Sequence, residues 1–320
     1  MILTSVTSCN DDDEDEDIIG NWEDRSVYDG APRSSAVVFT INNKAYVGTG
    51  YDGDDRLSDF WIYDIENDFW EPTPITNFPG SARSSAVAFS VNGKGYVGLG
   101  FDGDNELGDF YEYNPSSNTW SEIAEFPGGT RRGAIAFESL SFGYVGTGFD
   151  GDNDRKDFYR YNPSTNSWSI VAGYGGNKRR DASTFIIGNT VYVGAGSSNG
   201  LVLNDFWSFD LESSEWNRLN DLDDDDDDFV VRAGGVGFAI NGKGYFATGN
   251  TGNGITSSVW EYDPMTEDWK EKTAYEGVPR EDAVALYTQE RAFIALGRSG
   301  GLYLDDNHEF FPLEEEDEDD

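Results

Sequence analysis

One repeated pattern runs through almost the whole chain of 320 residues. An arginine that opens a short apolar segment recurs every 48 to 53 residues, at Arg33, Arg83, Arg131, Arg179, Arg232 and Arg280. A glycine recurs at the same intervals, at Gly50, Gly100, Gly148, Gly196, Gly249 and Gly297, and a tryptophan at Trp70, Trp120, Trp168, Trp216 and Trp269. Because three markers keep one register, we predict six copies of a single structural unit.

Each copy contains four short β-type segments separated by turn residues. In the second copy, two apolar segments flank Asn92-Gly93, a dipeptide that favours a type I′ hairpin turn. A third segment, Phe110–Tyr113, ends at Asn114-Pro115, and Trp120 belongs to the fourth. Four strands within one repeat of this length are typical of a β-propeller blade.

The two ends of the repeat predict how the ring of blades closes. Trp22 lies 48 residues before Trp70, and no tryptophan follows Gly297. We therefore expect a strand within Ile18–Asp24 to complete the sixth blade, which removes the open sheet edge. The predicted fold is all-β, a six-bladed propeller with four antiparallel strands per blade. In the last blade, Asp305–His308 stands where the third strand begins elsewhere, so we expect that strand to be shifted or distorted.

The motifs of the second copy resemble the kelch repeat. The matching segments are Tyr96–Gly100, Leu107–Asn114 and Trp120, and the resemblance extends over residues 22–311. The kelch pattern has paired glycines after its second strand, whereas this chain has Gly-x-Gly. The resemblance, which includes the central domain of galactose oxidase, implies a propeller but no particular activity, because propellers support many unrelated functions.

Charge divides the chain into a body and acidic segments. The net charge is −39, and the runs at residues 11–17, 223–228 and 314–320 supply 20 of the 61 acidic residues. We expect residues 18–313 to form the propeller, residues 1–17 a signal remnant and acidic tether, and residues 314–320 an acidic tail. A chain this acidic is not expected to bind nucleic acid, because phosphate contacts need positive charge.

The start of the chain suggests an anchor. The only cysteine, Cys9, follows a short apolar segment and precedes a run of acidic residues. This arrangement resembles a bacterial lipoprotein signal, which implies acylation of Cys9 and a place at the outer membrane or cell surface. The absence of a basic segment and the shortness of the apolar stretch depart from that pattern. A terminal segment with an incidental cysteine is the alternative, and we expect a monomer that contacts the membrane only through its lipid.

The six recurring arginines are the first candidate site. In a four-stranded meander, the entry to strand one and the loop between strands two and three lie at the same end of the blade. The arginines are therefore expected to ring one mouth of the central channel and to bind an anionic group. Ubiquitin-ligase adaptors of the kelch family, which the arrangement resembles, bind acidic peptides in this way. Alternatively, each arginine pairs with a neighbouring aspartate, such as Asp59, Asp109 or Asp157, and ties the blades together.

Other polar residues suggest further chemistry on the same face. We expect the working side of the mouth to lie on blades three, four and six, at Arg132, Arg180, Asp181, Glu281 and Asp282. The Asp-rich loops are weak candidates for calcium, and the alternative is tight turns capped by aspartate. The residues of these loops that could bind calcium are Asp52, Asp54, Asp102, Asp104, Asp150 and Asp152. We expect no other cofactor.

Residue types limit the possible enzymes. Copper-dependent galactose oxidase chemistry is excluded, because the chain has one histidine, His308, and no cysteine outside its leader. The secreted sialic acid epimerases, also six-bladed kelch propellers, imply a carboxylate as acid or base, and Glu281 or Asp181 could serve. We expect a non-catalytic scaffold that captures an anionic group on a protein or glycan at the cell envelope. A sugar-acid epimerase and a purely structural envelope component are the alternatives.

Overall fold

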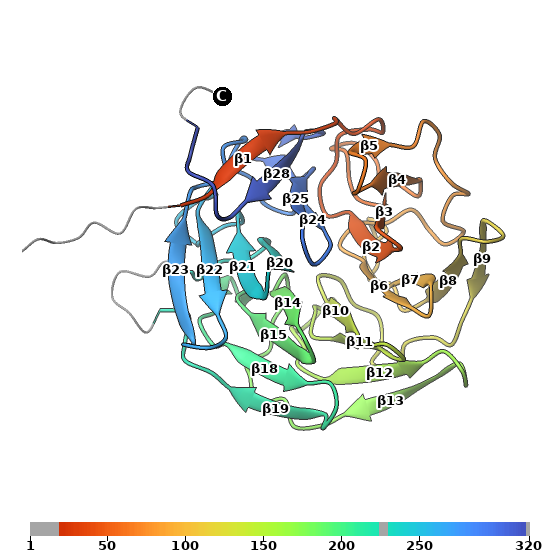
Figure 1. Cartoon of the computed structure of the whole chain (residues 1–320). Helices are drawn as coiled ribbons and strands as arrows, with labels where there is room; N and C mark the ends of the chain where they lie inside the picture. The colour runs from red at the N-terminus through yellow and green to blue at the C-terminus, as the bar shows by residue number, and fades with distance from the viewer. Residues whose placement is uncertain (1–18, 224–229, 318–320) are drawn as a thin grey trace, which may run out of the picture.

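The computed structural model describes residues 19–223 and 230–317, and these form six four-stranded antiparallel sheets around a central channel (Figure 1). The predicted propeller is confirmed. Blade one has β2 (Val37–Ile41), β3 (Lys44–Gly48), β4 (Phe60–Asp64) and β5 (Phe69–Trp70). Blade two has β6 (Val87–Val91), β7 (Lys94–Gly98), β8 (Phe110–Asn114) and β9 (Thr119–Glu122). Blade three has β10 (Ile135–Glu138), β11 (Gly143–Gly146), β12 (Phe158–Asn162) and β13 (Ser167–Val171).

The remaining blades follow the same plan, and two of them carry an extra hairpin. Blade four has β14 (Ser183–Ile187), β15 (Thr190–Gly194), β18 (Trp207–Asp210) and β19 (Glu215–Arg218), and blade five has β20 (Val236–Ile240), β21 (Lys243–Ala247), β22 (Val259–Asp263) and β23 (Asp268–Lys272). Blade six has β24 (Val284–Tyr287), β25 (Ala292–Ala295), β28 (Asn307–Phe311) and β1 (Asn21–Asp24). The hairpins are β16 (Ser197–Ser198) with β17 (Leu201–Val202), and β26 (Arg298–Ser299) with β27 (Leu302–Tyr303).

The N-terminal strand closes the ring as predicted. β1 pairs with β28 so that Trp22 stands opposite Phe310, and Figure 1 shows β1 beside β28 at the outer side of this blade. The Trp22 side chain is 1% exposed, and its ring stacks on Phe310 with centroids 4.6 Å apart. The last strand of the ring is therefore anchored by aromatic burial as well as by backbone hydrogen bonds.

The expectation of a shifted third strand in blade six is wrong. β28 begins at Asn307, at the same interval from Gly297 as Phe60 from Gly50. Blade six differs in which residue fills the first position of this strand, because Asn307 pairs with Ala295 where blade one pairs Phe60 with Gly48. The smaller side chain of Asn307 leaves room for the Ala295 methyl group, so the backbone keeps the common register.

The core lies between adjacent blades. A phenylalanine at or just before the start of the third strand is buried in blades one to four, at Phe60, Phe110, Phe158 and Phe206. The inner strands β2, β6, β10, β14, β20 and β24 surround the channel (Figure 1). Within residues 19–223 and 230–317 there is no helix with the length and apolarity needed to cross a membrane.

Candidate functional site

The expectation that the six recurring arginines line the channel mouth is wrong. Each is 0% exposed, buried in the body of the propeller. Arg83 donates to both carboxylate oxygens of Asp109, at 2.6 and 2.8 Å, and to the carbonyl oxygen of Leu99 at 2.9 Å. Arg33, Arg131 and Arg280 donate in the same way to both carboxylate oxygens of Asp59, Asp157 and Asp306. Arg179 forms an ion pair with Asp205, and Arg232 donates to the carbonyl and hydroxyl oxygens of Ser258.

These contacts explain both the arginines and the Gly-x-Gly motif. The motif is Gly-x-Gly in blades one to four and Ala-x-Gly in blades five and six. Its middle residue has a positive φ, between 57° and 63°, at Thr49, Leu99, Thr147, Ala195, Thr248 and Leu296. This conformation presents its carbonyl oxygen to the arginine of the same blade. The pairing with aspartate is the one that the structural alternative predicts, but each of these ion pairs lies within one blade and does not join two blades. The carboxylate and the carbonyl oxygen offset the desolvation of the buried guanidinium.

A closed ring of backbone hydrogen bonds forms the throat of the channel. The second residue after each buried arginine donates its N–H to the carbonyl oxygen of its counterpart in the preceding blade, at 2.7 to 3.0 Å. All six residues have a positive φ, between 51° and 62°. They are Ser35, Ser85, Gly133, Asp181, Gly234 and Asp282.

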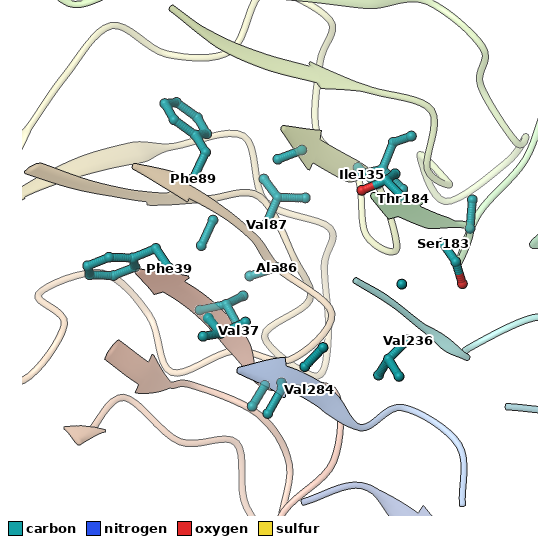
Figure 2. A pocket seen from close by; sticks show the side chains of 18 of the residues that line it. Val37, Phe39, Ala86, Val87, Phe89, Ile135, Ser183, Thr184, Val236 and Val284 are labelled. Atoms are coloured by element: carbon teal, nitrogen blue, oxygen red, sulfur yellow. The ribbon is translucent and has the colours of Figure 1, made fainter. Parts of the chain in front are cut away.

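Below the throat, mostly small side chains of the inner strands form the wall of the channel. Its cavity of about 350 Å³ is lined by successive inner strands, as Figure 2 shows for Val37, Ala86 and Thr184. Glu138 and Tyr287 also line it, at the ends of β10 and β24. Burial raises the pKa of Glu138 to about 7, although the backbone N–H of Ser90 opposes the shift.

Two of the predicted mouth residues, Asp181 and Asp282, stand in the throat ring itself. A Cβ atom on Gly133 or Gly234 would collide with the carboxylate of Asp181 or Asp282, so these glycines provide the space that the two side chains occupy. Burial, followed by repulsion from Asp282, raises the pKa of Asp181 to about 7. Burial also raises the pKa of Asp282, against the opposing effect of Arg298, which donates to it at 3.1 Å.

The other predicted mouth residues lie around this ring. Arg180 donates to Asp154 at 2.7 Å, and Glu281 accepts from Asn250 at 3.2 Å and pairs with Arg298 at 2.7 Å. Together with Arg132, they form a half-buried polar rim above the throat. These polar residues of blades three, four and six therefore lie at one end of the channel, and their use as the working side of the mouth stays a prediction.

A ladder of alternating arginines and aromatic rings also lies on this face, and the sequence reasoning missed it. The Cζ atom of Arg132 lies 4.5 Å from the ring centre of Phe101 and 5.3 Å from that of Phe149. Phe149 in turn contacts Arg180 at 3.9 Å, while Arg56 lies between Phe101 and Tyr51, at 4.7 and 5.1 Å. The sequence does contain a pattern that indicates this ladder, because an aromatic residue follows Gly-x-Gly in blades one to three only. The ladder consists of Tyr51, Arg56, Phe101, Arg132, Phe149 and Arg180.

The Asp-rich loops are built as turns. Asp52 Oδ1 accepts from the backbone N–H groups of Asp54 and Asp55, at 2.9 and 2.8 Å. Asp102 and Asp150 repeat this arrangement in the next two blades. This is the geometry of the turn alternative, and within the described ranges no three His, Cys, Asp or Glu residues are placed to hold a metal ion. Cys9 lies outside the described residues.

Comparison with known proteins identifies the type of domain. The family model for the KLHDC2/KLHL20/DRC7 Kelch-repeats domain matches residues 21–142 and 134–316. No curated protein matches the chain. Among 883 matching chains of solved structures, one titled "Structure of YjhT" aligns with a TM-score of 0.75 and 18% identity, over 88% of this chain and 95% of that chain. At this identity, the likeness shows the fold alone.

Proposed function

Because this chain belongs to the kelch-repeat family defined by the KLHDC2/KLHL20/DRC7 domain, we propose that it is a non-catalytic binding scaffold. Its ligand is an anionic group on a protein or glycan, bound at the channel mouth above the throat. The observation that carries this proposal is the position of Arg132 between Phe101 and Phe149.

The surroundings of Arg132 leave its charge available to a ligand. Its side chain is 31% exposed, and Glu106 Oε1 lies 3.5 Å from its Nη1, longer than a good hydrogen bond. The flanking rings of Phe101 and Phe149 hold the guanidinium in place through cation–π contacts. The in-plane N–H groups of an arginine held in this way are suited to a carboxylate, sulfate or phosphate group.

A binding screen with a matched variant tests the proposal. We would titrate the protein with galacturonate, a sulfated disaccharide and a Glu-rich peptide, and measure both the shift in Tm and the heat of binding. One of these probes should bind saturably, and R132Q should weaken it by about tenfold or more. R155Q is the control, because it removes an equal charge from an exposed residue of the same blade. Equal affinity of R132Q and the wild type would overturn the site.

A second candidate, a carbohydrate-processing enzyme acting on a sugar acid, is favoured by Asp181. A carboxyl group with a pKa of about 7 can both give and accept a proton near neutral pH. Arg180, the preceding residue, places a positive charge close to it. Proton NMR of a sugar-acid panel would show turnover that is lost in D181N or E281Q. A panel that stays unchanged with the wild type would remove this candidate.

We also propose that the protein is displayed on the cell envelope by a lipid on Cys9. The support is the sequence around Cys9, an apolar segment before it and acidic residues after it. Metabolic labelling with an alkyne fatty acid would mark the wild type but not C9S. Labelling of both proteins, or of neither, would contradict this location.

A further inference from the structure

The extra hairpins of blades four and six each present an exposed leucine on the mouth face. Leu201 is 70% exposed and Leu302 is 55% exposed. Both occupy the fifth position after the marker glycine, where the other blades have Asp55, Asn105, Asn153 and Gly254. Blades four and six are thus the two blades that offer a large apolar side chain to a partner at this position of the mouth face.

A polar cup lies between these two hairpins, over blades four to six. Its cavity of about 260 Å³ is lined by parts of both hairpins and by Asp181, Asn250, Glu281, Asp282 and Arg298. Gly200 and Val202 contribute from the first hairpin, and Arg298 begins the second. The cup is therefore the space between the two leucine-bearing hairpins, and the arginine–aromatic ladder lies mainly on the other side of the mouth.

The charges in the cup do not balance. Asp181, Glu281 and Asp282 face a single guanidinium, Arg298, which already binds Asp282 and Glu281 at 3.1 and 2.7 Å. Within the described residues, the carboxylate of Asp181 accepts no hydrogen bond, and Arg180 beside it is directed to Asp154 at 2.7 Å. A cationic group in the cup would supply the missing donor and relieve the repulsion between Asp181 and Asp282.

We propose that this cup binds a peptide segment of a partner protein through a lysine or arginine side chain that pairs with Asp181, while apolar neighbours in that segment pack on Leu201 and Leu302. The inference extends the proposed function, on which it rests for the premise that partners bind at this mouth. In this proposal, the half of the mouth that contains the cup binds a cationic group, and the half that contains Arg132 binds an anionic group. The strongly acidic body also favours the approach of a basic segment.

Fluorescence anisotropy with designed peptides tests this inference. The probe is a labelled octapeptide with a central lysine flanked by leucines, and the comparison peptide carries glutamine in place of the lysine. We expect saturable binding of the lysine peptide and binding of the glutamine peptide that is weaker by about tenfold or more. Equal affinities for the two peptides, or no saturation with either, would overturn the inference.

Matched variants locate the binding. D181N and the double variant L201S/L302S should each weaken the lysine peptide by about tenfold, through loss of charge and of apolar contact respectively. D104N removes an equal charge from an exposed loop of blade two and should change little. A D104N effect as large as that of D181N would show long-range attraction only and would overturn the site.

The two proposals fail separately. R132Q should weaken anion binding by about tenfold or more and leave the affinity for the lysine peptide unchanged, whereas D181N should weaken the lysine peptide by about tenfold and leave anion binding unchanged. Anion binding without any binding of the lysine peptide would overturn the cup alone. Binding of the lysine peptide without any binding of anions would support the cup and remove the anion site.

Discussion

The aromatic ring of Phe110 fills the space that a side chain on Gly98 would occupy, and the two residues face each other across β7 and β8. The same pairing of glycine with phenylalanine recurs in blades one, three and four. Where the glycine is replaced by alanine, the partner is smaller, as in Ala247 with Val259 and Ala295 with Asn307. The chain thus fills this packing position with either of two compatible pairs, glycine with phenylalanine or alanine with a smaller residue.

This relationship predicts that G98A is strongly destabilising and that a second substitution rescues it. The added methyl group should cost about 1–3 kcal/mol, because it overlaps the ring of Phe110. In the double variant G98A/F110V, which copies the pair of blade five, the loss should be smaller than the sum of the two single losses by about 1 kcal/mol or more. Urea unfolding of the four proteins measures this coupling.

Gly108 provides the control for this cycle. A Cβ atom there would have ordinary contacts, the nearest at 3.5 Å from Glu125. G108A should therefore change the free energy of unfolding by less than about 1 kcal/mol. Strict additivity of G98A and F110V would show that the two residues do not share one space.

The buried arginines predict a large stability effect of a different origin. R83A leaves the carboxylate of Asp109 without its main partner and should lower the free energy of unfolding by about 3–5 kcal/mol. R132A, at the mouth, should cost less than about 1 kcal/mol, because Arg132 is half-buried and its ion pair is long. Thermal unfolding compares them directly. A stable R83A protein that has lost ligand binding would instead assign Arg83 to the site.

How much could be predicted from the sequence depended on repetition. Arg131 and Arg132 are adjacent and chemically identical, yet one is buried and the other faces the mouth. The recurrence of Arg131 in every blade indicates a role in the common framework, whereas Arg132 occurs in blade three without an equivalent in most others. Repeated residues therefore predicted the blades and their closure, and the residues that differ between blades were the better guide to the mouth.

The rest of the site depends on contacts between blades, which the linear pattern does not contain. The throat ring links each blade to the next, and the first blade to the last, through backbone groups, so no side-chain motif marks it. The aromatic ladder and the leucine hairpins did leave a signal, as departures of some blades from the others at fixed positions. Blade topology placed these positions at one end of the propeller, but which side chains contact one another there required the structure.

The closing strand predicts that burial of Trp22 holds the ring together. W22A removes a side chain that is 1% exposed, and it should cost about 3–5 kcal/mol. E23A, on the same strand but with a side chain that is 39% exposed, should have a small effect. Denaturant unfolding of both variants provides the measurement. Similar losses for the two would mean that backbone pairing, not the indole ring, provides the closure.

The channel predicts a pH dependence through Glu138. Burial raises its pKa from 4.5 to about 7 in the folded protein, so the folded state keeps this proton over a range in which the unfolded chain has released it. The contribution of Glu138 to stability is therefore fully present below about pH 4.5, declines as the pH rises, and is lost above about pH 7. Urea unfolding between pH 4 and 8 should show a decline that is shallower in E138Q than in the wild type. The exposed Glu122 supplies the control, E122Q, which should keep the wild-type slope. An E138Q profile parallel to that of the wild type would mean that this carboxyl group titrates as it does in water, and that solvent fills the channel around it.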